Sequence, residues 1–377
     1  MSSPNPLADR RSLQSVDQDF PVTLVLGAGA WGTALAIHLA RRAPVGRIRL
    51  WAREAERIEA LARDQENHRY LPGQRLPQGL ALVADLRTAL LDWRQDAAQV
   101  PAESHGRSRA LLVLACPVAG LSALSANLRQ TLGPAQAGEG LIWLSKGLVM
   151  QPGQTAAFAW PSDQVDKACS QWPSGALSGP SFALEVARGL PVALTLASHQ
   201  MDWARAVASQ LHGGGMRVYT SPDLIGVQLG GAIKNVLAIA AGVADAMALG
   251  ANARAALITR GLAEAARLGQ ALGAQPETFM GLATLGDLVL TATGDLSRNR
   301  RVGMGLAAGR PLDQVLSELG HVAEGVLTAP AIAALGQARG VELPITQAVC
   351  RLLSGDWSAQ RAMQELLTRD PTDESHA

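Results

Sequence analysis

The segment 222–251, PDLIGVQLGGAIKNVLAIAAGVADAMALGA, limits the possible folds of this chain more than any other stretch. It has the length and apolar content of a buried helix, and its many Gly and Ala residues would let neighbouring backbone approach closely. Lys234 lies in its middle, and burying a lysine is costly unless the amine is paired or loses its proton. Either the stem of Lys234 snorkels outward to solvent, or the amine is desolvated and faces a ligand.

Composition narrows the class of protein. The chain has 377 residues, enough for two domains, and a formal net charge of +1, which gives no overall field for nucleic acid or an anionic membrane. Its three cysteines show neither metal-ligand nor disulfide spacing, as is typical of a reducing cytoplasm. The charged groups within 222–251 argue against a membrane span. We therefore expect a cytoplasmic protein without a metal site or integral membrane segment, and disordered tails at 1–20 and 369–377.

A glycine-rich turn follows the first predicted strand. Residues 22–26 form a β-branched-rich run, GAGAWG (27–32) comes next, and a good helix sequence follows. In this context Gly27 permits the tight turn, Gly29 lets the backbone approach a pyrophosphate, and Gly32 lets the helix pack on the strand. Free N–H groups at the start of the helix would receive the phosphates. The pattern predicts dinucleotide binding.

The end of the second predicted strand, 47–51, bears on the choice of cofactor. An NAD-selective site usually has an acid about twenty residues after the glycines, to bind the ribose 2′-hydroxyl. Here Trp51, Ala52 and Arg53 occupy that place. Arg53 could pair with a 2′-phosphate, which favours NADPH over NADH, although the neighbouring Glu54 weakens the argument. The alternative is that Arg53 is simply a solvated arginine.

The remaining strand candidates indicate a sheet covered on both faces. They are the runs 80–84, 110–116, 140–145, 192–197 and 216–220. Beyond 222 no strand pattern appears. We therefore predict an α/β fold with an N-terminal Rossmann-type doubly wound sheet over 21–221, followed by an all-α domain over 222–368.

Two candidate ligand contacts follow strands of this sheet. Lys146 lies directly after 140–145, which places it at the carboxyl edge of the sheet, where ligands bind in such folds. The sequence SGPS (178–181) opens a helix after another strand. Its residues are explained either as an ordinary turn or as a place where Ser181 and nearby N–H groups face a substrate.

Two further candidate ligand contacts lie in the predicted helical half. Asp287 is alone in the apolar segment 281–293, so we expect it to pair with Lys234 or with substrate hydroxyls, or else to be a helix N-cap. The segment 295–301 holds three arginines within four residues. Arginine fits phosphate oxygens well, but a basic loop of this kind is also explained by solvation alone.

Together these segments resemble the family of bacterial NAD(P)-dependent sn-glycerol-3-phosphate dehydrogenases, over about residues 22–367. The motifs that carry the resemblance are GAGAWGTALA (27–36), SKGL (145–148), SGPSFALE (178–185), GVQLGGAIKNVLAI (226–239), ANARAALITRGLAE (251–264), TLGDLVLT (284–291), SRNRRVG (297–303) and VAEG (322–325). The helical half is similar to that of the 6-phosphogluconate dehydrogenase group.

The resemblance implies reversible hydride transfer between NAD(P)H plus dihydroxyacetone phosphate and sn-glycerol 3-phosphate, which supplies the backbone of glycerophospholipids. It implies a small-molecule phosphate substrate, with a homodimer as one possible assembly. Lys234 would be the general acid/base. The implied substrate contacts are Lys146, Gly179, Ser181, Asp287, Ser297, Arg298 and Asn299. The implied cofactor contacts are Gly27, Gly29, Ala30, Trp31, Gly32, Arg53, Lys146, Ala183, Arg298, Val322 and Glu324.

The chain departs from the family motifs at a few positions, and two other classes of protein are alternatives. Ala30 replaces a serine that is common in the fingerprint, and Cys116-Pro117-Val118-Ala119 stands where the family usually carries Ser-His. A related β-hydroxyacid dehydrogenase would share the glycine turn but should lack the SRNR and LGGAIKN sequences. A nucleotide-binding protein without catalytic activity should lack Lys234 or Asp287.

Overall fold

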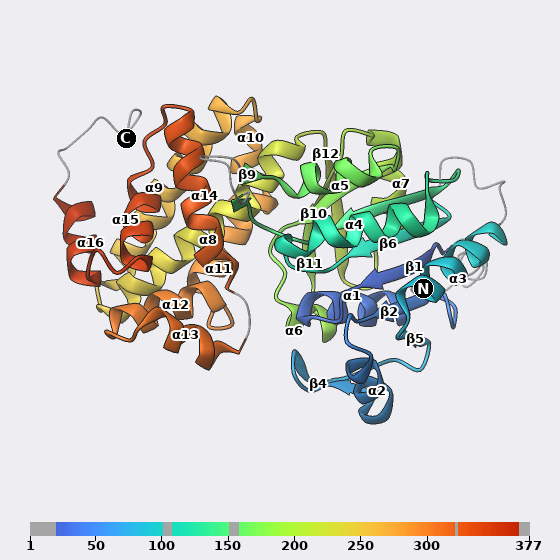
Figure 1. The fold of residues 1–377 in the computed structure, drawn as a ribbon. Helices are drawn as coiled ribbons and strands as arrows, with labels where there is room; N and C mark the ends of the chain where they lie inside the picture. Colours follow the sequence, from blue (N-terminus) through green and yellow to red (C-terminus); the bar gives the residue numbers. More distant parts are fainter. Residues whose placement is uncertain (1–19, 101–107, 151–157, 321–322, 369–377) are drawn as a thin grey trace, which may run out of the picture.

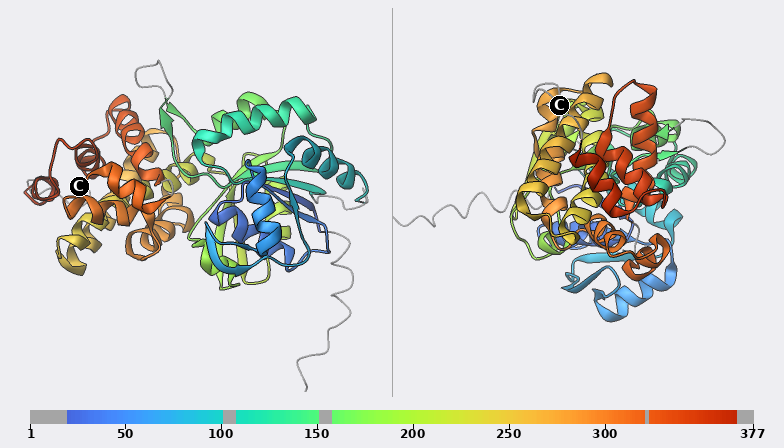
Figure 2. Two further views of the ribbon diagram at one scale, coloured as in Figure 1. Left: turned by 60° about the horizontal axis from the view of Figure 1, so that its bottom comes forward. Right: turned by 90° about the vertical axis from the view of Figure 1, so that its left-hand side faces the viewer.

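The computed structural model describes residues 20–100, 108–150, 158–320 and 323–368. Residues 1–19 and 369–377 of the proposed tails and Val322 lie outside the described residues, whereas Phe20, the last residue of the first proposed tail, is described and is buried in a hydrophobic core. Figure 1 shows a strand-containing half and a purely helical half side by side, and Figure 2 shows the same arrangement from two other directions. Among the described residues, the last strand ends at Ser221 and the long helix of the second half begins at Leu224.

An eight-stranded sheet forms the first half, in the order β12-β11-β10-β7-β6-β1-β2-β5. Its strands are β1 (Val22–Leu26), β2 (Ile48–Trp51), β5 (Leu80–Val83), β6 (Ala110–Leu114), β7 (Glu139–Trp143), β10 (Ser174–Ser178), β11 (Val192–Ala197) and β12 (Met216–Ser221). The pairs from β5 to β10 are parallel, β10 and β11 are antiparallel, and β11 and β12 are parallel. The strand order reverses beside β1, which marks the ligand-binding edge of a doubly wound sheet. The predicted fold class is confirmed.

Helices cover both faces of this sheet and bury two hydrophobic cores. One core joins the sheet to α1 (Ala30–Ala40), α2 (Ala55–Asp64), α6 (Ala183–Ala187) and α7 (Met201–Leu211). The other joins the opposite face to α3 (Leu86–Ala98), α4 (Val118–Leu132) and α5 (Pro161–Cys169). Burial on both faces explains why β1, β6 and β7 are continuous apolar or fully buried runs.

Two short antiparallel pairs lie outside the main sheet. They are β3 (Glu66–Asn67) with β4 (Leu71–Arg75), and β8 (Val149–Met150) with β9 (Phe158–Ala159). The first pair supports the glycine turn: the buried Asn67 side chain donates to the Ala28 carbonyl at 3.0 Å and to the Thr33 hydroxyl at 2.8 Å.

The helix α8 (Leu224–Ala246) is the centre of the second half. It is long and apolar enough to cross a membrane, but 94% of its apolar window is buried inside the protein, so it is a core helix. Around it pack α9 (Gly250–Ala271), α10 (Pro276–Phe279), the π-helical turn η1 (Leu282–Gly286), α11 (Asp287–Thr293), α12 (Arg298–Ala307), α14 (Glu324–Ala338) and α15 (Pro344–Leu353). The outer helices are α13 (Leu312–Leu319) and α16 (Ala359–Leu367).

Candidate active site

Lys234 lies where α8 meets the edge of the sheet. Its side chain is buried, with the residue only 7% exposed, so the interpretation of Lys234 as a snorkelling surface lysine is wrong. Gly231 makes this position possible, because a Cβ there would lie 3.1 Å from the Ser178 hydroxyl and 3.5 Å from the Lys146 side chain. The small residues of α8 therefore bring the helix, and its lysine, against the strand-end residues of the other half.

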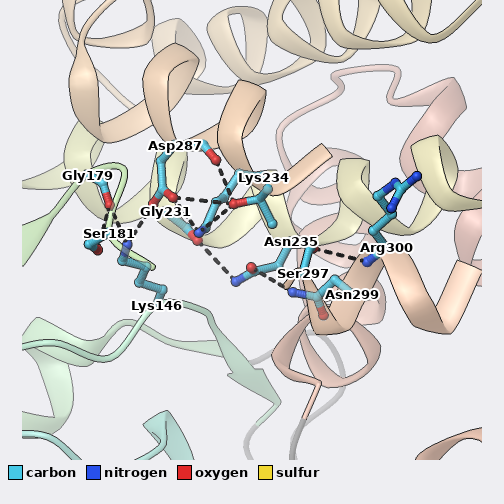
Figure 3. Close-up of polar contacts among 11 residues, drawn as sticks. Lys146, Gly179, Ser181, Gly231, Lys234, Asn235, Asp287, Ser297, Asn299 and Arg300 are labelled. Carbon is cyan, nitrogen blue, oxygen red and sulfur yellow. Dashed lines mark hydrogen bonds and ion pairs between the residues drawn. The ribbon is translucent and has the colours of Figure 1, made fainter. Parts of the chain in front are cut away.

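One carboxylate binds two lysines at this junction (Figure 3). The amine of Lys234 donates to Asp287 Oδ1 at 2.7 Å, and the amine of Lys146 donates to Asp287 Oδ2 at 2.6 Å. Lys146 follows β7, Lys234 comes from α8, and Asp287 is the first residue of α11. Three segments far apart in the sequence thus meet in a single ionic group.

Asp287 is not a helix N-cap, so that alternative is wrong. The N-cap of α11 is Gly286, and the carboxylate of Asp287 points to the two amines instead. The preceding turn, η1, is π-helical, and such turns are common at functional sites. Gly230 accommodates this turn, because a Cβ there would lie 1.9 Å from the Thr284 hydroxyl.

The charges at the junction shift one another's pKa values. Burial, and to a smaller extent Lys146, lowers the pKa of Lys234 to about 8 against the opposing effect of Asp287. Burial opposes the charged form of Asp287, but Lys146 and Lys234 outweigh it and hold the pKa of this carboxyl below its ordinary value. Lys234 is therefore an amine that exchanges its proton much nearer to neutral pH than a solvated lysine would.

Thr291 belongs to the same group but is not among the predicted site residues, although it is the last residue of the motif TLGDLVLT. Lys234 donates to its hydroxyl at 3.0 Å, and that hydroxyl donates in turn to the Asp287 carbonyl at 2.6 Å. The sequence held a signal for it: Asp287 and Thr291 are four residues apart, so one face of α11 presents both.

The SGPS turn lies beside Lys146. Gly179 has a φ of +132°, which favours glycine, and its carbonyl accepts from the Lys146 amine at 3.0 Å and from the Ser181 hydroxyl at 3.0 Å. Ser181 is half-buried. The structure therefore brings the predicted contacts Lys146, Gly179, Ser181 and Asp287 together.

The predicted basic loop is largely the first turn of α12. Ser297 is its N-cap and accepts from the Arg300 N–H at 3.2 Å, while the side chain of Arg298 is exposed. Asn299 is buried: its amide donates to Asn235 Oδ1 at 2.8 Å, and its oxygen accepts from the Gly325 N–H at 3.0 Å. Asn299 thus joins α12 to α8 and α14, and one of its two amide hydrogens remains for another acceptor.

Glu324 begins α14 close to the charges of the junction. Burial raises the pKa of Glu324 above its ordinary value, although Arg298, Lys234 and Lys146 favour its charged form, as does the Val118 N–H. The structure therefore links this predicted cofactor contact to the two lysines and to the start of α4.

The glycine turn fits a dinucleotide phosphate group. A Cβ at Gly29 would meet no atom of the described residues within 4 Å, whereas one at Gly32 would lie 2.1 Å from the Gly27 carbonyl. Gly29 is also the N-cap of α1 and provides no side-chain cap, so the first N–H groups of that helix, at Ala30 and Trp31, lack an intrahelical acceptor. Open space and free donors at a helix N-terminus suit an anion.

The other predicted cofactor contacts line the same edge. The buried Trp31 Nε1 has no hydrogen-bond acceptor among the described residues. Ala183 is the first residue of α6, which packs against α1. The Arg53 side chain is 86% exposed and pairs with Glu54 at 3.1 Å; Glu54 also pairs with Arg57 at 3.0 Å. Arg53 is thus accessible to a ligand, but it already has an acidic partner.

Comparisons with known proteins agree with this geometry. Residues 22–204 match the family model "NAD-dependent glycerol-3-phosphate dehydrogenase N-terminus", and residues 223–364 match the model for the C-terminus of the same family. The chain is 49% identical over 352 residues to "Glycerol-3-phosphate dehydrogenase [NAD(P)+]" from Paucimonas lemoignei, covering 93% of this chain and 98% of that protein. It is 51% identical over 354 residues to the protein of that name from Ralstonia nicotianae, with the same two coverages.

A solved structure supports the assignment. The crystal structure of glycerol-3-phosphate dehydrogenase from Coxiella burnetii superposes with a TM-score of 0.80 at 37% identity, covering 93% of this chain and 100% of that one. The match thus includes both the sheet and the helical half. The chain belongs to the NAD-dependent glycerol-3-phosphate dehydrogenase family.

Proposed function

We propose that this chain catalyses the reversible reduction of dihydroxyacetone phosphate to sn-glycerol 3-phosphate with NADPH or NADH. We place the reaction in the cytoplasm, where it would supply the backbone of glycerophospholipids. The observation that carries the proposal is the ionic group at the carboxyl edge of the sheet, formed by the buried Asp287 and Lys234 with the partly buried Lys146. Because the chain belongs to a family of dehydrogenases, we assign this group to the oxidation and reduction of the substrate.

Lys234 is the proposed general acid/base. In the reducing direction its ammonium form donates a proton to the carbonyl oxygen, and in the oxidising direction its neutral form accepts one from the substrate hydroxyl. The pKa of about 8 supports both roles, because each protonation state is accessible near neutral pH. Asp287 and Thr291 hold the amine in place by accepting hydrogen bonds at 2.7 and 3.0 Å.

Lys146 and the residues around it are the proposed substrate contacts. Lys146 offers a positive charge at the strand edge and is hydrogen-bonded to Gly179 and Asp287, while Ser181 also binds Gly179; we propose that the substrate oxygens bind beside these residues. Fixing the substrate at several points holds the reacting carbon in place, which is itself a large part of catalysis.

The start of α12 is the proposed phosphate site. Arg298 is exposed and, within the described residues, donates no hydrogen bond, so its guanidinium is available to phosphate oxygens. Ser297 and the remaining amide hydrogen of Asn299 lie on the same turn. A dianionic phosphate would raise the pKa of Lys234, and neutralising it with Arg298 would limit that effect.

The glycine turn is the proposed pyrophosphate site. Gly27, Gly29, Gly32 and the N–H groups of Ala30 and Trp31 would hold the cofactor phosphates. A bound nicotinamide cofactor would supply the hydride. Further cofactor contacts are proposed at Lys146, Ala183, Arg298, Glu324 and Val322, the last lying outside the described residues.

We also propose that NADPH is preferred over NADH. The support is Arg53, an accessible guanidinium just beyond the end of β2, where the adenosine ribose lies in such folds. Glu54 reduces this preference by pairing with the same guanidinium.

Two further proposals concern the division of the chain into domains and its oligomeric state. The chain divides at residues 221–222 into a cofactor domain and a helical catalytic domain, supported by the change from strands to helices between Ser221 and Leu224. The second is assembly as a homodimer, which light scattering of the purified protein would measure.

One assay tests the proposed function. Consumption of NADPH and of NADH is followed with dihydroxyacetone phosphate, and glyceraldehyde 3-phosphate serves as the control substrate. The proposal predicts turnover with dihydroxyacetone phosphate at a rate well above that of the control. Equal turnover of the two triose phosphates, or none of either, would reject it.

A further inference from the structure

An ion pair far from the reacting groups joins α12 to the end of α8. Arg300 Nε donates to Asp245 Oδ2 at 2.6 Å, and both side chains are only 12% exposed. Arg254 of α9 binds the other oxygen, Oδ1, at 2.7 Å. Asp245 is near the C-terminus of α8, eleven residues and therefore about 16 Å along the helix from Lys234. Arg300 thus cannot act on the reacting centre by contact.

The backbones of α8 and α12 approach so closely that glycine is required on both helices. A Cβ at Gly242 of α8 would lie 2.0 Å from the Arg300 carbonyl, and a Cβ at Gly303 of α12 would lie 2.0 Å from the Ile239 carbonyl. Closer to the catalytic centre, the amide of Asn299 binds that of Asn235. The two helices are therefore fixed together at the glycine crossing and at two polar pairs, one on either side of it.

Arg300 is connected directly to the first turn of α12. Its own backbone N–H donates to the hydroxyl of the N-cap residue Ser297 at 3.2 Å, as Figure 3 shows, so the residue that binds Asp245 is also hydrogen-bonded to the cap of the turn that presents Arg298. A second contact of Arg300, with Asp295 at 3.1 Å, involves a carboxylate that is 95% exposed and contributes little.

We propose that Arg300 and Asp245 are positioning residues for the phosphate site: their ion pair fixes the start of α12 against α8 so that Ser297 and Arg298 meet the substrate phosphate. Of the three arginines in this segment, Arg298 would bind substrate and Arg300 would orient it. The inference rests on the proposed role of Arg298 in the reaction.

The test compares variants whose changes in charge are opposite. Arg300→Gln removes a positive charge and Asp245→Asn removes a negative one, yet each breaks the same pair. If the pair positions Arg298, both variants should raise the KM for dihydroxyacetone phosphate about 5–20-fold, as expected when a charge-assisted hydrogen bond to substrate is misaligned. The kcat of each variant should stay within about threefold of wild type. A long-range electrostatic effect would instead move the two KM values in opposite directions.

Three further variants complete the experiment. Arg301→Gln removes a charge from the neighbouring residue, whose Nε binds the Asp295 carbonyl at 3.0 Å, and is the matched control with an unchanged KM. The double variant Arg300→Gln/Asp245→Asn, which restores neutrality, should raise KM no more than either single change. Arg300→Lys keeps the charge and should recover part of the loss.

Several outcomes would overturn the inference. They are opposite shifts in the two single variants, additive effects in the double variant, or an unchanged KM in Arg300→Gln when Arg298→Ala raises it. If Arg298→Ala itself leaves KM unchanged, the proposed phosphate site fails instead, so the two failures are distinguishable. Circular dichroism and thermal unfolding establish that each variant is folded. If both single variants are unfolded, the KM values of the double variant and of Arg300→Lys decide whether the ion pair positions Arg298.

Discussion

Asp287 receives the amine of Lys234 on one carboxylate oxygen, at 2.7 Å, while its other oxygen holds Lys146. One buried negative charge therefore compensates two amines, the buried one of Lys234 and the partly buried one of Lys146, and the three groups carry a net positive charge when both lysines are protonated. Removing the carboxylate would leave two amines that repel each other without the acceptor that both of them bind. The relationship predicts that Asp287 controls the protonation of Lys234 as well as its position.

The pH dependence of the Asp287→Asn variant tests this relationship. Reduction needs the ammonium form of Lys234, so wild-type kcat/KM should fall as pH rises through about 8, and kcat/KM for oxidation should rise over the same range. Asp287 raises the pKa of Lys234, so its removal should move both limbs to lower pH. Asp313→Asn, a change at an exposed carboxylate of α13, is the control. Limbs that stay in place or move to higher pH would contradict the argument.

Glycine substitutions separate cofactor binding from stability. Gly29→Ala should change thermal unfolding little, because the new Cβ would meet no atom within 4 Å in the part of the chain that the structure describes, but it should weaken cofactor binding by filling the space that phosphate needs. Gly32→Ala should cost about 1–3 kcal/mol of stability through its clash with the Gly27 carbonyl. Calorimetry and titration with NADPH measure the two effects. Undiminished NADPH affinity in Gly29→Ala would exclude this turn as the phosphate site.

Replacing Arg53 should change cofactor selectivity. For Arg53→Ala we expect the ratio of kcat/KM for NADPH to that for NADH to fall about 5–20-fold, a partial loss of a charge-assisted hydrogen bond at an exposed position. The matched control is Arg63→Ala, an arginine of α2 that pairs with its neighbour Asp64 in the same way. Equal selectivity before and after the change would rule out Arg53 as the 2′-phosphate contact.

Arg298→Ala should weaken binding of the phosphorylated substrate. We expect the KM for dihydroxyacetone phosphate to rise about 10–100-fold, because a guanidinium contact with a dianion is lost. Arg301→Ala removes the same charge three residues away and should change KM about twofold or less. The assignment of Arg298 to the phosphate does not survive if the two variants have the same KM.

Much of the strand-containing half was predictable from local pattern. The runs 22–26 and 192–197 were predicted with the bounds that the structure shows, because strands buried on both faces are continuous apolar runs. The glycine turn was equally predictable, because each of its glycines meets a steric requirement that follows from the local sequence.

The catalytic group was only partly predictable because its members meet through tertiary packing. A costly buried charge could be inferred separately for Lys234 and for Asp287. Local sequence, however, does not decide whether Lys234 snorkels to solvent or whether Asp287 is a helix N-cap. Only the packing of α8 and α11 against the strand edge decides between these and the ion pair. The division of the arginines, with Arg300 bound to Asp245 and Arg298 left exposed, depends on the helix crossing and could not be inferred from their spacing.

The most direct test of the account is turnover by Lys234→Ala, measured beside its affinity for NADPH and for dihydroxyacetone phosphate. The control is Lys167→Ala, which removes an exposed lysine of α5 and should behave as wild type. If the Lys234 amine transfers the proton, the variant should bind both ligands while kcat falls about 10²–10⁴-fold. A variant that binds both ligands and turns over at the wild-type rate would contradict it.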